Sequence, residues 1–191
     1  MDMACDALLP LANLTGSEIL RNLLLISGLA VAITSVWTSK IIARRKQTAD
    51  LLFASRIDQQ LSDGLDVIRQ LHNDPNGNIR AAFPEKKAMP SDTAEAEKYQ
   101  EQKKKSVLIN YVLNHWERIS IGIDEGIYDE RMLRYASNTS LINLYTQSLP
   151  YIEAVRERSR VPTYYVDIER LALRWKSMPL RPKKIKRRAF M

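Results

Sequence analysis

Two carboxylates and one amide lie at helical spacing in the middle of the chain. Asn114 and Glu117 are three residues apart and Asp124 follows seven later, so a helix here would place them on one side. Two carboxylates on one helix face could perform acid–base chemistry or hold a cation. The stretch is largely apolar, however, and a buried carboxylate needs a partner. We therefore favour a structural ion pair, with Arg156 or Arg160 as the cation, over a catalytic site. The candidate residues form a predicted buried polar cluster: Asn114, Glu117, Asp124 and Arg156.

The other reactive side chains match no known constellation. His72 and His115 are the two histidines and lack the spacing of helical metal ligands. The single cysteine, Cys5, excludes an intramolecular disulfide and a cysteine-based metal cluster. Neither a phosphate-binding glycine loop nor a serine nucleophile elbow is present. We expect no catalytic residue, metal or cofactor, and an enzyme using Glu117 and Asp124 is the alternative.

The net charge of +7 is concentrated in two short segments, whereas the middle of the chain is nearly balanced. Such basic segments are candidates for contact with anionic lipid headgroups. Binding of nucleic acid by the C-terminal tail is the less favoured reading, because no aromatic platform or recognition motif accompanies its charge. The candidate headgroup contacts are Lys40, Arg44, Arg45, Lys46, Lys183, Lys184, Lys186, Arg187 and Arg188.

The first basic segment follows a long apolar stretch. Asn22 to Ser39 contains no charged residue, and apolar neighbours extend it to about 20 positions, which a helix converts into about 30 Å. That length matches the hydrocarbon core of a bilayer. A core helix of a soluble protein is the main competing reading, but such helices seldom run so long without a charge. The sequence therefore predicts a transmembrane helix.

The flanking charges predict the orientation of this helix. Only Arg21 precedes it, beside Glu18, whereas four basic residues follow it, namely Lys40, Arg44, Arg45 and Lys46. Basic flanks stay in the cytoplasm. We expect the N-terminus outside, the remaining chain in the cytoplasm, and the protein in the cell inner membrane. A cleaved signal peptide would need a basic start instead.

Helical periodicity continues beyond the membrane segment. Thr48 to His72 carries an apolar stripe at spacings of four and three, formed by Phe53, Ile57, Leu61, Leu65 and Ile68. Turn-forming residues and prolines follow from Asn73 to Ser91. Asp92 to about Asp124 predicts a long helix whose second half is apolar over a wide arc, as in the middle of a bundle.

Three shorter helices are predicted after Gly126, which ends the long one. Asp129 could cap a short helix through Tyr135. Ser140 to about Arg158 is helical, with Pro150 kinking or dividing it. The last helix, Thr163 to Lys176, places Tyr164, Ile168, Leu171 and Trp175 on one face.

Strand-like alternation is missing, so the expected fold is all-α, with one N-terminal transmembrane helix followed by a small cytoplasmic helical bundle. The predicted segments are a short extracytoplasmic N-terminus (1–18), the transmembrane helix (19–42), a juxtamembrane basic segment with an amphipathic helix (43–72), a loop or linker (73–91), the helical domain (92–176) and a basic tail (177–191).

Three stretches together carry a family resemblance. These are Leu113–Glu130, then Pro150-Tyr151-Ile152 followed by Arg156, and Ile168–Ala172 ending at Trp175. Over residues 45–176 the chain resembles the bacterial and phage family called domain of unknown function 4760, whose members often have an N-terminal membrane helix. The resemblance supports the architecture and implies no activity.

The sequence thus predicts a single-pass, membrane-anchored helical protein that acts as a protein-interaction or regulatory module. The expected partners are the lipid bilayer, an unidentified protein partner and, as an open alternative, further copies of the chain.

Overall fold

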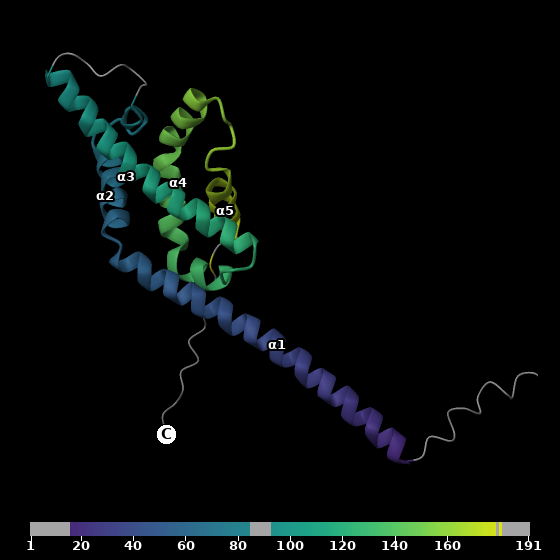
Figure 1. Ribbon diagram of the computed structural model, residues 1–191. Helices are drawn as coiled ribbons and strands as arrows, with labels where there is room; N and C mark the ends of the chain where they lie inside the picture. The colour runs from purple at the N-terminus through teal and green to yellow at the C-terminus, as the bar shows by residue number, and fades with distance from the viewer. Residues whose placement is uncertain (1–15, 85–92, 179, 181–191) are drawn as a thin grey trace, which may run out of the picture. The chain divides into compact units, whose positions relative to one another are not determined.

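The computed structural model describes residues 16–84, 93–178 and 180, and this part of the chain is all-helical (Figure 1). Helix α1 spans Gly16–Ile57, α2 Gln59–Asn73, α3 Thr93–Asp124, α4 Glu130–Ser159 and α5 Val166–Ser177. A short 3-10 helix, η1, covers Arg80–Ala82. The predicted all-α class is confirmed for these residues. The chain divides into two compact units between Ala43 and Arg44, so the division falls within α1.

The first unit is the apolar part of α1. Its large side chains, from Leu23 to Trp37, are all exposed. The hydroxyl groups within it donate to carbonyl groups of the same helix: Ser27 to Leu24 at 2.9 Å and Thr38 to Thr34 at 2.7 Å. Among the described helices, α1 is the one long and apolar enough to cross a membrane.

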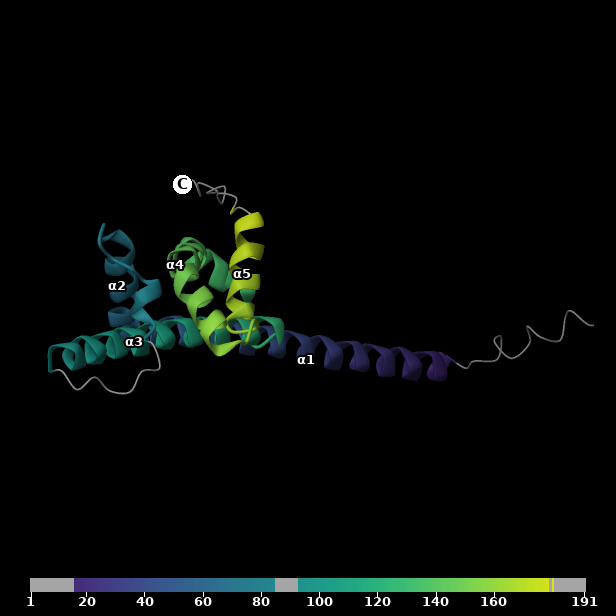
Figure 2. The same ribbon diagram turned by 90° about the horizontal axis from the view of Figure 1, so that it is seen from above.

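The second unit is a helical bundle in which α3 is the longest of the complete helices. Helices α2, α4 and α5 lie on one side of α3 (Figure 2). The core draws on the apolar residues predicted for the second half of α3, and Ile109, Val112 and Leu113 are fully buried. The largest buried side chain, Trp175, comes from α5. The wide apolar arc of α3 is therefore explained by packing against more than one neighbouring helix, namely α2 and α5.

Helix α2 approaches α3 closely at Gly64. A Cβ atom at this position would lie 2.7 Å from the carbonyl oxygen of Leu108 and would also collide with the Val112 side chain. Glycine thus lets the two backbones meet, which outweighs its low helix propensity.

The prediction of one amphipathic helix from Thr48 to His72 is wrong. Helix α1 continues to Ile57, and α2 begins at Gln59 after Asp58, whose extended backbone breaks the chain of helical turns. The Asp58 carboxylate accepts a hydrogen bond from the Leu61 N–H at 3.0 Å and so caps α2. Because the axis changes here, the apolar stripe splits: Leu61 is buried, whereas Phe53 and Ile57 are 66% and 87% exposed.

One helix stands where two were predicted, the first through Tyr135 and the second from Ser140, and Pro150 does not divide it. Helix α4 runs without interruption from Glu130 through Pro150 to Ser159. The predicted cap is confirmed, since the Asp129 carboxylate accepts from the Met132 N–H at 3.0 Å. Tyr151 and Ile152, directly after the proline, are fully buried. Their packing against the bundle holds the helix together despite the missing N–H group of Pro150.

The last helix begins later than predicted. Tyr165 has a left-handed backbone (φ 59°, ψ 31°) and precedes α5, which starts at Val166 rather than Thr163. The Tyr165 side chain is buried, whereas Tyr164, predicted on the core face, is exposed. Gly126, with φ at 69°, follows the end of α3 as predicted.

Candidate functional site

The three polar residues predicted on one face of α3 have different environments. Asn114 is exposed, and Glu117 is partly buried against the start of α5. The Glu117 carboxylate accepts the backbone N–H of Ile168 at 2.8 Å and that of Asp167 at 3.3 Å. Burial raises the pKa of Glu117, although these two N–H groups oppose the rise. Its partner is therefore a helix N-terminus rather than Arg156 or Arg160.

Asp124 and Arg156 belong to two separate ion-pair groups. The Asp124 carboxylate accepts from Arg170 at 2.5 Å and from Arg174 at 3.3 Å, both on α5. Arg156 donates to Glu169 at 2.6 Å and to the Tyr164 carbonyl oxygen at 2.9 Å. The structure thus does not bring the four candidate residues together as one cluster. Each charged member instead fixes a different point of α5.

These contacts leave the carboxylates of α3 poorly placed for acid–base chemistry. A general acid or base must face a substrate, but Glu117 accepts two backbone N–H groups and Asp124 lies between two arginines. Within the described ranges, no group of three or more histidine, cysteine, aspartate or glutamate side chains could hold a metal ion.

The first basic segment is exposed in the structure. Lys40 belongs to the first unit, and Arg44, Arg45 and Lys46 begin the second. Arg45 forms an ion pair with Asp129 at 3.5 Å while most of its side chain stays exposed. The basic residues of the tail, Lys183, Lys184, Lys186, Arg187 and Arg188, lie outside the described residues.

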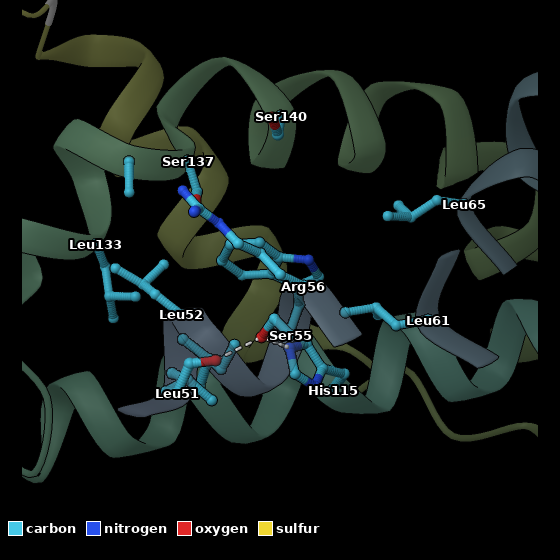
Figure 3. Close-up of a pocket in the computed structure, with 13 residues that line it drawn as sticks. Leu51, Leu52, Ser55, Arg56, Leu61, Leu65, His115, Leu133, Ser137 and Ser140 are labelled. Carbon is cyan, nitrogen blue, oxygen red and sulfur yellow. Dashed lines mark hydrogen bonds between the residues drawn. The ribbon is translucent and has the colours of Figure 1, made fainter. Parts of the chain in front are cut away.

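A cavity of about 240 Å³ lies in the second unit between α1, α2, α3 and α4 (Figure 3). Most of its wall is aliphatic or aromatic. Ser55 and Arg56 from α1, His115 from α3, and Ser137 and Ser140 from α4 add polar groups. The apolar lining consists of Leu51, Leu52, Leu61, Leu65, Trp116, Ile119, Leu133 and Ala136.

Ser55 and His115 meet in this cavity (Figure 3). The Ser55 Oγ lies 3.3 Å from His115 Nε2 and donates to the Leu51 carbonyl oxygen at 2.8 Å. Because the Ser55 hydroxyl donates to that carbonyl oxygen, it does not donate to Nε2, as a serine activated by a histidine base must. The pair therefore differs from a serine–histidine nucleophile.

The electrostatics around His115 favour a neutral ring. Burial lowers the pKa of His115, and the nearby Arg118 adds to this effect, whereas Asp58 opposes it. Asp58 itself accepts from the Tyr111 hydroxyl at 2.7 Å, which lowers the pKa of its carboxyl group. The cavity thus offers hydrogen-bonding groups and one permanent cation, Arg56, beside an apolar wall. This arrangement suits binding better than catalysis.

Sequence reasoning did not find this cavity. Ser55 and His115 lie 60 positions apart and on different helices. Arg56 and Ser137 carry no motif that would mark them. One signal was available, since Asp58 followed by a helical pattern is typical of an N-cap and marks the end of α1.

A family model matches residues 22–175, and its description is domain of unknown function (DUF4760). The chain belongs to the DUF4760 family. The match begins within the apolar part of α1 and includes all the residues that line the cavity. Comparison with curated proteins and with solved structures found no match.

Proposed function

We propose that α1 anchors this DUF4760 chain in the cytoplasmic membrane through residues 19–42. In this proposal the N-terminus lies outside, and the helical bundle acts in the cytoplasm as a protein-interaction or regulatory module. The proposal extends a coarser finding, namely that α1 is long and apolar enough to cross a membrane.

The observation that carries the proposal is the exposure of the charge-free stretch Asn22–Ser39. None of the most apolar 18-residue window is buried, so the described structure offers this surface no protein neighbour. Burial of one leucine-sized side chain contributes about 1.5–3 kcal/mol, so the whole stretch strongly favours leaving water. A helix can enter hydrocarbon because its backbone groups bond internally, and Ser27 and Thr38 also donate within the helix.

The orientation follows from the flanking charges. Lys40, Arg44 and Lys46 follow the apolar stretch and are exposed, whereas Arg21 stands before it with Glu18 nearby. Retention of basic flanks in the cytoplasm supports the proposed topology. The same exposed cations could rest on anionic headgroups, each contributing about 1 kcal/mol near the surface. The basic tail is proposed to contact the same surface.

The proposed interaction role is supported by exposed apolar side chains near the C-terminal end of α1. Phe53 and Ile57 lie one turn apart on α1, and both are exposed beyond the basic segment. Contiguous exposed apolar surface is typical of interaction sites, and these two side chains would form part of one. An unidentified protein or a second copy of the chain would cover them. Photo-crosslinking from a photoreactive residue at Ile57 should give a defined adduct, and the same residue at the exposed Asn143 should not.

Membrane fractionation tests the anchor. The full-length chain should sediment with membranes and stay there after an alkaline carbonate wash. Leu29→Arg with Ile33→Arg should release it, because each arginine at a helix centre costs about 2.5–3.5 kcal/mol of insertion free energy.

The matched control places arginines on the bundle instead. Val107→Arg with Leu173→Arg adds the same charge at exposed apolar positions and should leave the chain in the membrane fraction. Wild-type protein in the soluble fraction, or equal release of both double variants, would contradict the anchor.

A further inference from the structure

The cavity of the second unit has a closed end and an open end. Leu61, Trp116, Ile119 and Leu133 are buried and form the closed end. Arg56, Ala136 and Ser140 are exposed and form the open end. The character of the wall therefore changes from apolar inside to polar at the solvent.

The closed end is large enough for a compact apolar group. An apolar cavity of about 150 Å³ in a protein core holds a benzene-sized molecule. The volume here is about 240 Å³, part of which belongs to the open end. The space thus suits one aromatic ring or a short alkyl chain, and is too small for a folded peptide segment.

The open end carries an unused positive charge. Arg56 reaches over the cavity in Figure 3, and none of the residues that line the cavity is acidic. Ser137 and Ser140 on α4 line the same cavity and can donate hydrogen bonds. Neutral His115 and Ser55 lie deeper and already bond to each other. One cation with hydroxyl donors around it is complementary to one anionic group.

We propose that this cavity binds a small organic carboxylate whose apolar body is one aromatic ring or a short alkyl chain. The carboxylate pairs with Arg56 at the open end, where its oxygens also accept from Ser137 or Ser140. The apolar body fills the space between the leucines of α1 and α2 and the Trp116 face of α3. A cationic amphiphile would meet Arg56 with like charge, and a neutral one would gain only the apolar contact.

Calorimetric titration of octanoate into the full-length chain in nanodiscs tests this inference, with empty nanodiscs subtracted to remove partitioning into lipid. Wild-type protein should show one saturable site. Arg56→Gln should weaken octanoate binding about tenfold or more, because a charge-assisted bond is lost. Arg69→Gln is the matched control, since Arg69 is an exposed arginine on α2 away from the cavity, and should bind as wild type. Octanol and octylammonium should each bind at least tenfold more weakly than octanoate.

A second variant tests the location independently of charge. Ala136→Phe places a ring at the open end and should abolish binding while thermal unfolding stays as in wild type. Absence of saturable octanoate binding in the wild type would overturn the proposal, as would an Arg56→Gln affinity equal to wild type or unchanged binding in Ala136→Phe. The inference is independent of the anchor, because octanoate binding and membrane fractionation are separate measurements.

Discussion

Carboxylates accept hydrogen bonds from backbone N–H groups at the starts of α2, α4 and α5. Two of these carboxylates are close in sequence to the helix that they cap, and one is distant. Asp58 and Asp129 cap the helices that they precede, α2 and α4 respectively. Glu117 caps α5 from the middle of α3, 50 positions away in sequence. Local caps are readable from sequence because the side chain and its target are three residues apart. The long-range cap by Glu117 cannot be predicted from sequence, because it depends on the packing of α3 against α5.

Replacement of Glu117 should therefore destabilise the bundle rather than remove an activity. Glu117→Ala leaves the N–H groups of Asp167 and Ile168 without their acceptor, which should lower the unfolding free energy by about 1–2 kcal/mol. Glu117→Gln keeps one acceptor oxygen, so its unfolding free energy should fall by less than that of Glu117→Ala. Thermal unfolding of the full-length chain in detergent, followed by circular dichroism, measures both. Equal stability of Glu117→Ala and wild type would contradict the capping role.

The same residue predicts a pH dependence. Burial raises the pKa of Glu117 in the folded state, so the folded chain holds this proton more tightly than the unfolded chain. The contribution to stability is then fully present below the usual glutamate pKa and is lost as the pH rises through the folded value. The stability of wild type relative to Glu117→Gln should accordingly fall as the pH rises above about 4.3, the usual glutamate pKa. An increase over this range would show that the backbone N–H groups outweigh burial.

Thr48 holds α1 to the turn before α4. It is fully buried, donates to the Arg44 carbonyl oxygen and accepts from the Asp129 N–H, both at 2.8 Å. Thr48→Val keeps the shape of the side chain but leaves the Asp129 N–H without its acceptor. This loss should lower the unfolding free energy by about 1–3 kcal/mol. Thr48→Ser keeps the hydroxyl and should cost less than 1 kcal/mol, roughly the loss of one methyl group. We expect hydrogen exchange at the Asp129 amide to be faster in Thr48→Val than in wild type, and unchanged in Thr48→Ser. Equal exchange rates in Thr48→Val and wild type would contradict this role of Thr48.

At the scale of helices, periodicity predicted which segments are helical but not where they break. The apolar spacing from Phe53 to Ile68 is the same before and after Asp58, so it is compatible with one continuous helix. Spacing alone does not indicate that the helix axis changes at Asp58. At Pro150 the sequence predicted a break that the structure does not have. The burial of Tyr151 and Ile152 outweighs the local effect of the proline. Start and end signals at Asp129 and Gly126 were reliable because their cause is local. The cavity could not be predicted, because four helices form it.

Pro150 should carry a measurable cost inside α4. Without its N–H group, the carbonyl of Thr146 lacks its helical donor, a loss of about 3 kcal/mol relative to alanine, offset by less than 1 kcal/mol from the stiffer unfolded chain. Pro150→Ala should therefore raise the unfolding free energy by about 2 kcal/mol. Asn143→Ala, exposed on the same helix, should change it by less than 1 kcal/mol. A loss of stability in Pro150→Ala would mean that the core requires the geometry that proline imposes.

At the scale of the whole molecule, the chain combines two kinds of helix. The apolar part of α1 exposes its side chains all round, whereas α3, α4 and α5 bury one or more faces within the bundle. The DUF4760 match includes both kinds, from residue 22 to residue 175. The run Asn22–Ser39 predicted this contrast, because eighteen consecutive residues without charge are rare in a helix of a soluble protein.

The proposed topology is tested most directly by thiol accessibility, because Cys5 is the single cysteine of the chain. In spheroplasts of an expression host, a membrane-impermeant maleimide should label Cys5 of the wild type without lysis. In the variant Cys5→Ser with Asn143→Cys, the thiol on α4 should react only after lysis. Labelling of the α4 thiol in intact spheroplasts, with Cys5 protected until lysis, would reverse the topology. Labelling of neither thiol before lysis, or of both, would contradict a membrane-spanning α1.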